Sequence, residues 1–190
     1  MTSDTQLIEA TLRGESAAFG QLVRKYQDRL FNTLYHLTGN HEDASDLTQD
    51  AFVQAFVKLD TFRRSSTFYT WLYRIAFNRT ASYYRGKKTT HSLDREQQAT
   101  GREPVETDPG PCEQLEQEES RTQVREALAR LSEEHRTILI LREMDGCDYE
   151  TIADIIEVPV GTVRSRLYRA RAQMHILLKE ILAAEAGGEA

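Results

Sequence analysis

Cysteine and long apolar runs are scarce in this sequence. Its two cysteines, Cys112 and Cys147, lie far apart and form no CxxC pair, which argues against a disulfide or a structural metal and for a reducing compartment. No apolar run approaches the length of a membrane span, and the first residues lack the basic-then-apolar pattern of a signal peptide. We therefore expect a cytoplasmic protein without membrane insertion.

Catalytic motifs are also lacking. The sequence has no GxSxG nucleophile motif, no phosphate-binding loop and no cysteine–histidine pair with a residue to orient it. His36 and His41 lie near several carboxylates, but their spacing matches no HExxH pattern. We expect no enzyme activity, no cofactor and no metal site.

Two long stretches contain no acidic residue, although the chain has a net charge of −6. Residues 61–88 hold seven Lys or Arg and no Asp or Glu, and residues 158–179 hold five basic and no acidic groups. Between them, residues 91–120 have a net charge of −7. Two basic segments separated by an acidic one are typical of a protein that binds a polyanion at two sites.

The apolar periodicity predicts an all-α protein with two domains. Residues 1–88 are expected to form an antiparallel four-helix bundle, and residues 113–183 a second helical domain with a fraying tail at 184–190. Residues 89–112 hold three of the four prolines and many acidic residues, which predicts a flexible linker. Expected helix caps are Ser16, Asn40, Ser65, Ser66, Thr67, Ser132 and Asp148, and expected stops are Gly14, Gly39 and Gly86.

The helix expected at 68–85 is rich in aromatic residues. A helical wheel places Phe68, Leu72 and Ala76 on a buried stripe, with Arg79 an exception on that apolar side. The opposite face would be exposed and carries Thr70, Tyr73, Arg74, Phe77, Ala81 and Tyr84, flanked by Asn78 and Arg85. Rings and cations on one exposed face suit a strand of unpaired bases. The alternative is a helix packed on two sides, whose rings are mostly core.

The last two helices form a predicted helix-turn-helix around Val158–Pro159–Val160. In the second of them, Val163, Leu167 and Ala170 face the core. The opposite side presents Arg164, Ser165, Tyr168 and Arg169, with Arg166 and Arg171 on the flanks where phosphates would lie. The alternative is an ordinary helical hairpin with a solvated basic face.

Acidic residues line one side of the helix expected after Asn40. They are Glu42, Asp43, Asp46 and Asp50, with Gln49 and Gln54 nearby. Such a row is either a solvated helix face or a docking surface for a basic partner.

Three segments of the sequence resemble parts of the extracytoplasmic-function (ECF) sigma factors of bacterial RNA polymerase. FRRSSTFYTWLYRIAFNRTASYYRGKK is similar to the promoter-melting segment of the family, and LSEEHRTILILREMDGCDYETIADIIEVPVGTVRSRLYRARAQM to its C-terminal domain. EDASDLTQDAFVQAF resembles the helix that docks on the polymerase. The chain departs from the family pattern at Arg64, where Gly is common, and at Ser132, where Pro is usual.

The resemblance implies a role for each half of the chain. Residues 1–88 would be sigma region 2, 89–112 a linker and 113–183 sigma region 4. The clamp coiled coil of the largest polymerase subunit would bind around Asp46, Gln49, Asp50 and residues 52–56, which include Val53 and Phe56. Recognition of the −10 element would use Arg63, Arg64, Ser65, Ser66, Thr67, Tyr73, Arg74, Phe77, Asn78, Tyr84 and Arg85. Recognition of the −35 element would use Arg164, Ser165, Tyr168 and Arg169, with Arg166 and Arg171 beside them.

The implied partners are core RNA polymerase, through its clamp coiled coil and flap region, promoter DNA and an anti-sigma factor. A stand-alone helix-turn-helix regulator with a sensor bundle is the alternative, and it should have a ligand pocket and no exposed aromatic helix. An RNA-binding adaptor fits less well, because the sequence has no RRM or KH signature.

Overall fold

The computed structural model describes the backbone of residues 3–90 and 111–187, and the side chains of residues 3–80 and 118–184. Within these residues the chain is helical and has no strand, which confirms the all-α prediction. The elements in chain order are α1 (Asp4–Leu12), α2 (Ser16–Thr38), α3 (His41–Val57), η1 (Leu59–Thr61), α4 (Phe68–Thr90), α5 (Pro111–Arg130), α6 (Glu133–Leu139), η2 (Ile140–Met144), α7 (Tyr149–Ile156) and α8 (Val160–Gly187).

Short-range capping sets most of the helix starts in the N-terminal half. The Asn40 side chain accepts the backbone N–H of Asp43 at 3.0 Å, and Thr67 Oγ1 accepts that of Thr70 at 3.1 Å. Gly39 ends α2 with a φ of 69°, a left-handed conformation that glycine adopts without a steric penalty. The prediction that Ser16 caps α2 is wrong. Ser16 is the first residue of the helix, and Glu15, which occupies the cap position, makes no side-chain capping bond.

Leucines from α2 form the centre of the N-terminal core. Leu22, Leu30 and Leu34 are fully buried in one core cluster that also holds residues of α3 and α4. Leu72 and Ala76 of α4 are also fully buried, which confirms the predicted stripe. Burial of large aliphatic side chains supplies most of the stabilisation of such a bundle.

The C-terminal half contains a helix-turn-helix built from α7 and α8. The Asp148 carboxylate accepts the N–H of Thr151 at 2.7 Å and so caps α7. Glu157 follows with a φ of 55°, and Pro159 starts the next turn. The preceding segment is capped by Ser132 as predicted, but its last residues form a π-helical turn, η2, that the periodicity does not reveal.

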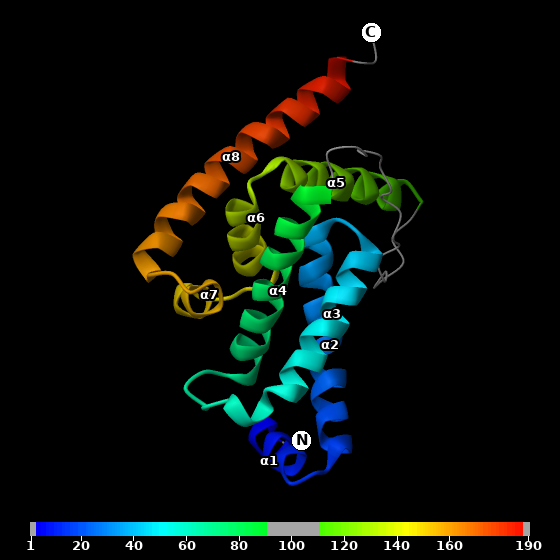
Figure 1. The fold of residues 1–190 in the computed structure, drawn as a ribbon. Helices are drawn as coiled ribbons and strands as arrows, with labels where there is room; N and C mark the ends of the chain where they lie inside the picture. The colour runs from blue at the N-terminus through cyan, green and yellow to red at the C-terminus, as the bar shows by residue number, and fades with distance from the viewer. Residues whose placement is uncertain (1–2, 91–110, 188–190) are drawn as a thin grey trace.

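The two halves pack directly on one another. Figure 1 shows α7 beside α4, and contacts join α4 to α7 and α2 to η2 and α6. Arg136 of α6 donates to the carbonyl of Leu37 at the end of α2 at 2.9 Å, and its other nitrogens donate to carbonyls at the end of α5. The guanidinium therefore satisfies the C-terminal carbonyls of two helices at once.

Several helix ends differ from the predictions. Gly86 does not stop α4, which continues to Thr90, because glycine inside a helix costs only about 1 kcal/mol unless the next turn needs a left-handed residue. Pro111 begins α5 two residues before the expected start. The residues expected to fray are helical as far as Gly187. Residues 91–110, most of the predicted linker, and 188–190 lie outside the described residues.

Candidate functional site

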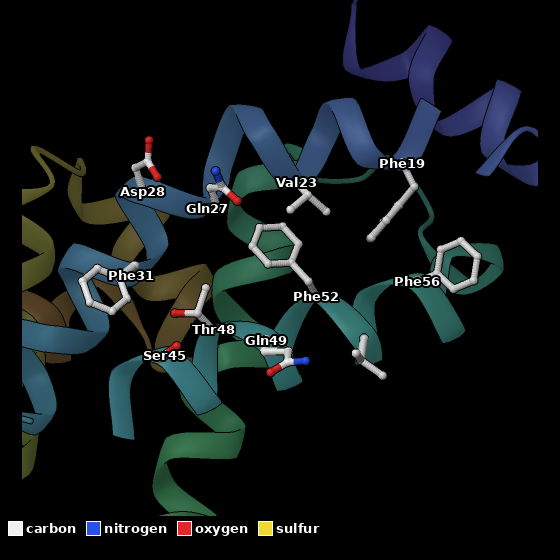
Figure 2. A pocket seen from close by; sticks show the side chains of 11 residues that line it. Phe19, Val23, Gln27, Asp28, Phe31, Ser45, Thr48, Gln49, Phe52 and Phe56 are labelled. Carbon is white, nitrogen blue, oxygen red and sulfur yellow. The ribbon is translucent and has the colours of Figure 1, made fainter. Parts of the chain in front are cut away.

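A groove of about 690 Å³ lies open between α2 and α3. Its apolar lining includes Phe56 and Val53, which are 47% and 51% exposed, and Phe56 meets the ring of Phe19 edge to face with centroids 5.0 Å apart. Figure 2 shows side chains of both helices directed at the same hollow. The full lining is Phe19, Val23, Gln27, Asp28, Phe31, Ser45, Thr48, Gln49, Phe52, Val53 and Phe56.

The five residues assigned to polymerase docking divide into two groups. Gln49, Val53 and Phe56 line the groove. Asp46 and Asp50 are exposed on α3 but do not line it, and Asp50 accepts a hydrogen bond from Arg79 at 2.7 Å. The helical wheel placed Arg79 on the apolar side of α4. In the structure its charge is exposed and paired with Asp50.

The sequence reasoning missed the α2 half of the groove. Val23 and Phe31 are half-buried there, while Gln27 and Asp28 are exposed. Phe31 lies outside the leucine stripe of α2. The leucine stripe is sufficient to pack α2 on the core, so the additional apolar ring of Phe31 could have indicated a second apolar surface on this helix.

The prediction that the side of α4 with Tyr73 and Phe77 is exposed is wrong. Tyr73 is fully buried, Phe77 is 9% exposed and Thr70 is 4% exposed. The rings of Tyr69 and Tyr73 lie 4.1 Å apart between centroids, and α7 packs over this side of α4. The helix is thus packed on two sides, as the alternative stated. Tyr84 and Arg85 lie outside the described side chains.

Burial also raises the pKa of these tyrosines. Loss of solvent raises the pKa of Tyr69 and of Tyr73 far above the usual value of 10.0. Both hydroxyls are protonated at neutral pH, as a tyrosine of ordinary pKa also is. They act as hydrogen-bonding groups, with Tyr69 facing Cys147 Sγ at 3.2 Å and Tyr73 facing Thr33 Oγ1 at 3.0 Å.

The loop between α3 and α4 is largely exposed. Arg63, Ser65 and Thr67 are exposed and Ser66 is half-buried. Arg64 has a φ of 55°, and its guanidinium donates to Glu9 of α1 at 2.7 Å. A positive φ at this position gives a physical reason why glycine would be common there.

The face of α8 for which the sequence predicts DNA recognition is exposed to solvent, as expected. Tyr168 is 78% exposed, and Arg164, Ser165 and Arg169 are exposed beside it. On the other side of α8, Val163, Leu167 and Ala170 are buried in the domain core.

The flanking arginines are paired within the domain. Arg171 donates to Glu143 through two nitrogens at 2.9 and 2.6 Å, and Arg166 lies 3.3 Å from Glu134. These pairs hold both guanidinium groups at the edges of this exposed face. Contact with a phosphate would have to compete with the carboxylates.

Two further findings concern other site types. Within the described ranges, no three His, Cys, Asp or Glu side chains are placed to hold a metal ion together. Among the described helices, none combines the length and apolar character that crossing a membrane requires.

Known proteins resemble both halves of the chain. The models for sigma-70 region 2 and sigma-70 region 4 match residues 22–90 and 121–174. RNA polymerase sigma-H factor of Pseudomonas aeruginosa is 36% identical over 184 residues, which cover 94% of this chain and 95% of that protein. ECF RNA polymerase sigma-E factor of Escherichia coli is 38% identical over 175 residues, covering 89% and 91%.

Solved structures agree with these matches. The sigma factor RpoE in complex with the anti-sigma factor NepR from Bartonella quintana has a TM-score of 0.67 at 28% identity, over 85% of this chain and 96% of that chain. CnrH in complex with the cytosolic domain of CnrY has a TM-score of 0.68 at 26% identity, over 92% and 96%. With both sigma regions matched in order and relatives aligned over almost their whole length, the chain belongs to the ECF sigma factors, the transcription initiation factors of bacterial RNA polymerase.

Proposed function

We propose that this chain binds core RNA polymerase, recognises the −35 and −10 elements of a promoter and promotes opening of the DNA between and around them. Residues 1–88 dock on the polymerase and recognise the −10 element, and residues 113–183 recognise the −35 element. The protein acts in the cytoplasm and catalyses no reaction of its own.

The observation that carries this proposal is the open groove between α2 and α3. Its floor is apolar and two of its large side chains, Val53 and Phe56, are about half exposed. Asp28 lines it and Asp46 lies exposed on α3. An apolar groove with carboxylates nearby suits a helical partner that has both apolar and basic residues. The clamp coiled coil of the polymerase is the partner that the family resemblance implies.

The exposed face of α8 supports the assignment of the −35 element. Arginine can bond guanine through two nitrogens in the major groove, and the tyrosine and serine hydroxyls give further polar contacts. Arg164, Ser165, Tyr168 and Arg169 occupy that face, with Arg166 and Arg171 at its edges. The same domain is proposed to contact the flap region of the polymerase.

The −10 element is assigned to the loop at 63–67 and to the helix that follows it. Arg63, Ser65 and Thr67 are accessible in the free chain, whereas Tyr73 and Phe77 are covered. Arg74, Asn78, Tyr84 and Arg85 complete the proposed set. Base stacking on aromatic rings gives about 1–3 kcal/mol per base, which is enough to offset the cost of unstacking one base.

An anti-sigma factor is proposed as a regulatory partner. Both solved relatives described above are complexes with a second protein, and in one of them that protein is named an anti-sigma factor. The open groove gives such a partner an apolar surface on which it would exclude the polymerase.

Transcription in vitro with purified core polymerase tests the proposal. Core enzyme with this chain should start transcripts at discrete sites on a bacterial promoter library, and mapping those starts should reveal shared −35 and −10 sequences. Core enzyme without this chain should not start transcripts at these sites. Protection of duplex DNA by the chain without polymerase, together with no new start sites, would instead support a stand-alone regulator.

A further inference from the structure

The loop between α3 and α4, residues 63–67, is fixed at both of its ends. Just before it, the ring of Phe62 is half-buried and lies 5.3 Å from the ring of Trp71 between centroids. At its other end, Thr67 Oγ1 accepts the backbone N–H of Thr70 at 3.1 Å and so caps α4. Packing and capping therefore set where the loop begins and ends, and the path of its middle depends on other contacts.

Arg64 ties the middle of the loop to α1. Its Nη2 donates to Oε1 of Glu9 at 2.7 Å, and both side chains are about half exposed. The backbone of Arg64 has a φ of 55°, a left-handed conformation that is disfavoured for a residue with a side chain. A bond that the guanidinium makes in this conformation raises the population of the conformation. The pair is thus placed to hold the loop in the arrangement seen in the free chain.

The helix that carries Glu9 is itself fixed to the bundle. Figure 1 shows α1 at the end of the bundle where the chain passes from α3 to α4, and contacts join α1 to α2 and to η1. Leu7 and Ile8 of α1 are buried in the N-terminal core. On α2, Lys25 Nζ donates to one carboxylate oxygen of Asp4 and the Tyr26 hydroxyl to the other. The carboxylate of Glu9 therefore holds the loop from a rigid support.

This arrangement changes the role that the sequence suggests for Arg64. The sequence places Arg64 among the residues that would contact the −10 element, but its guanidinium is bonded to a carboxylate. A carboxylate beside this arginine offsets its charge and would repel a DNA phosphate. Arg63 and Ser65, on either side, are exposed. Contact with DNA suits these two neighbours better than it suits Arg64.

We propose that Glu9 is a positioning residue for −10 recognition and that Arg64 is its anchor in the loop, not a contact to DNA. The pair holds residues 63–67 in one arrangement, so that Arg63 and Ser65 meet the bases already in place. The assignment of the loop to the −10 element rests on the proposed function. Helix α1 precedes residues 22–90, which match sigma-70 region 2, so this support lies outside the matched segment.

Two substitutions weaken the pair from opposite sides. Glu9→Gln keeps the shape of the side chain but turns a charge-assisted bond into a neutral one. Arg64→Gln removes the cation and keeps a residue with a side chain at the positive φ. Glu15→Gln is the matched control, because Glu15 is an exposed glutamate just after α1 whose carboxylate lies 3.6 Å from Arg13 instead of meeting the loop.

Nuclear spin relaxation of the free full-length chains tests the anchor without DNA or polymerase. We expect the order parameters of the backbone amides of Arg64 and Ser65 to lie near the rigid value of about 0.85 in the wild type and in Glu15→Gln. They should be clearly lower in Glu9→Gln and in Arg64→Gln, with native helicity by circular dichroism in every variant. Wild-type order parameters in both folded variants would overturn the proposal.

Promoter discrimination tests what the anchor does. The rate of open-complex formation by core polymerase with each chain is measured on a promoter mapped by the transcription experiment and on versions with one −10 base changed. An exposed ion pair is worth a small free energy, so we expect Glu9→Gln and Arg64→Gln each to lower the ratio of these rates by about two- to fivefold. The double variant should lose no more than either single one, because both remove the same bond. Discrimination at the −35 element should not change, and Glu15→Gln should behave as the wild type.

The opposite result is expected if Arg64 contacts DNA. Glu9→Gln would then release the guanidinium and strengthen promoter binding, whereas Arg64→Gln would weaken it and reduce the slope of its salt dependence by about one. Effects of opposite sign in these two variants would overturn the proposal, and so would a loosened loop with wild-type discrimination. Failure of the transcription experiment would remove the assignment of the loop to promoter DNA and leave the relaxation result standing.

Discussion

Truncation of Phe56 gives a sharp test of the groove. In the free chain this side chain is 47% exposed, so docking of a partner can bury about half of a phenylalanine surface of roughly 200 Å². At about 25 cal/mol per Å², the lost burial in Phe56→Ala is about 2 kcal/mol, which corresponds to an affinity loss of roughly 30-fold. Stability should fall by a similar or smaller amount, because the buried half packs on Phe19.

Val57→Ala is the matched control for this change. Val57 is the neighbouring residue and is more exposed, at 67%, but it does not line the groove. We expect its truncation to change affinity by less than about threefold, in line with exposed residues outside the centre of an interface. The assay is a fluorescence anisotropy titration of labelled chain with core polymerase, accompanied by thermal denaturation of each variant. Wild-type affinity in folded Phe56→Ala, or equal losses in both variants, would refute docking at the groove.

Three further predictions concern other parts of the chain. Arg169→Ala should weaken −35 duplex binding by about 1–3 kcal/mol and relax base choice there; equal losses on unrelated duplexes would make Arg169 a phosphate contact. Arg64→Gly should be more stable to urea than Arg64→Ala by about 0.5–1 kcal/mol, because only glycine removes the left-handed strain at φ 55°, and equal stabilities would show that no strain exists. Burial raises the pKa of Asp145 above its ordinary value of 3.8, although Thr33 and Arg29 oppose the rise. The contribution of Asp145 to the free energy of unfolding should therefore increase as pH falls from neutral toward 3.8 and decrease as pH rises through the raised pKa; urea denaturation of the wild type and of Asp145→Asn at a series of pH values checks this, and a stability difference between them that does not change with pH would contradict it.

Local chemistry explains which predictions from the sequence are confirmed. Asn40, Ser132 and Asp148 cap their helices as expected, because a cap is a bond between residues three positions apart and depends on little else. The buried side of α8 is confirmed for the same reason: Val163 and Leu167 recur at the helical period. Both kinds of feature can be read within one turn or one helix.

Contacts between distant segments explain what was missed. A wheel shows that Tyr73 and Phe77 share a side of α4, but it contains no information about α7, which lies about eighty residues further along the chain and covers that side. The α2 half of the groove escaped prediction likewise, since Val23 and Phe31 gain meaning only when α3 is placed beside them. Periodicity assigns residues to faces, and tertiary packing decides which faces are covered.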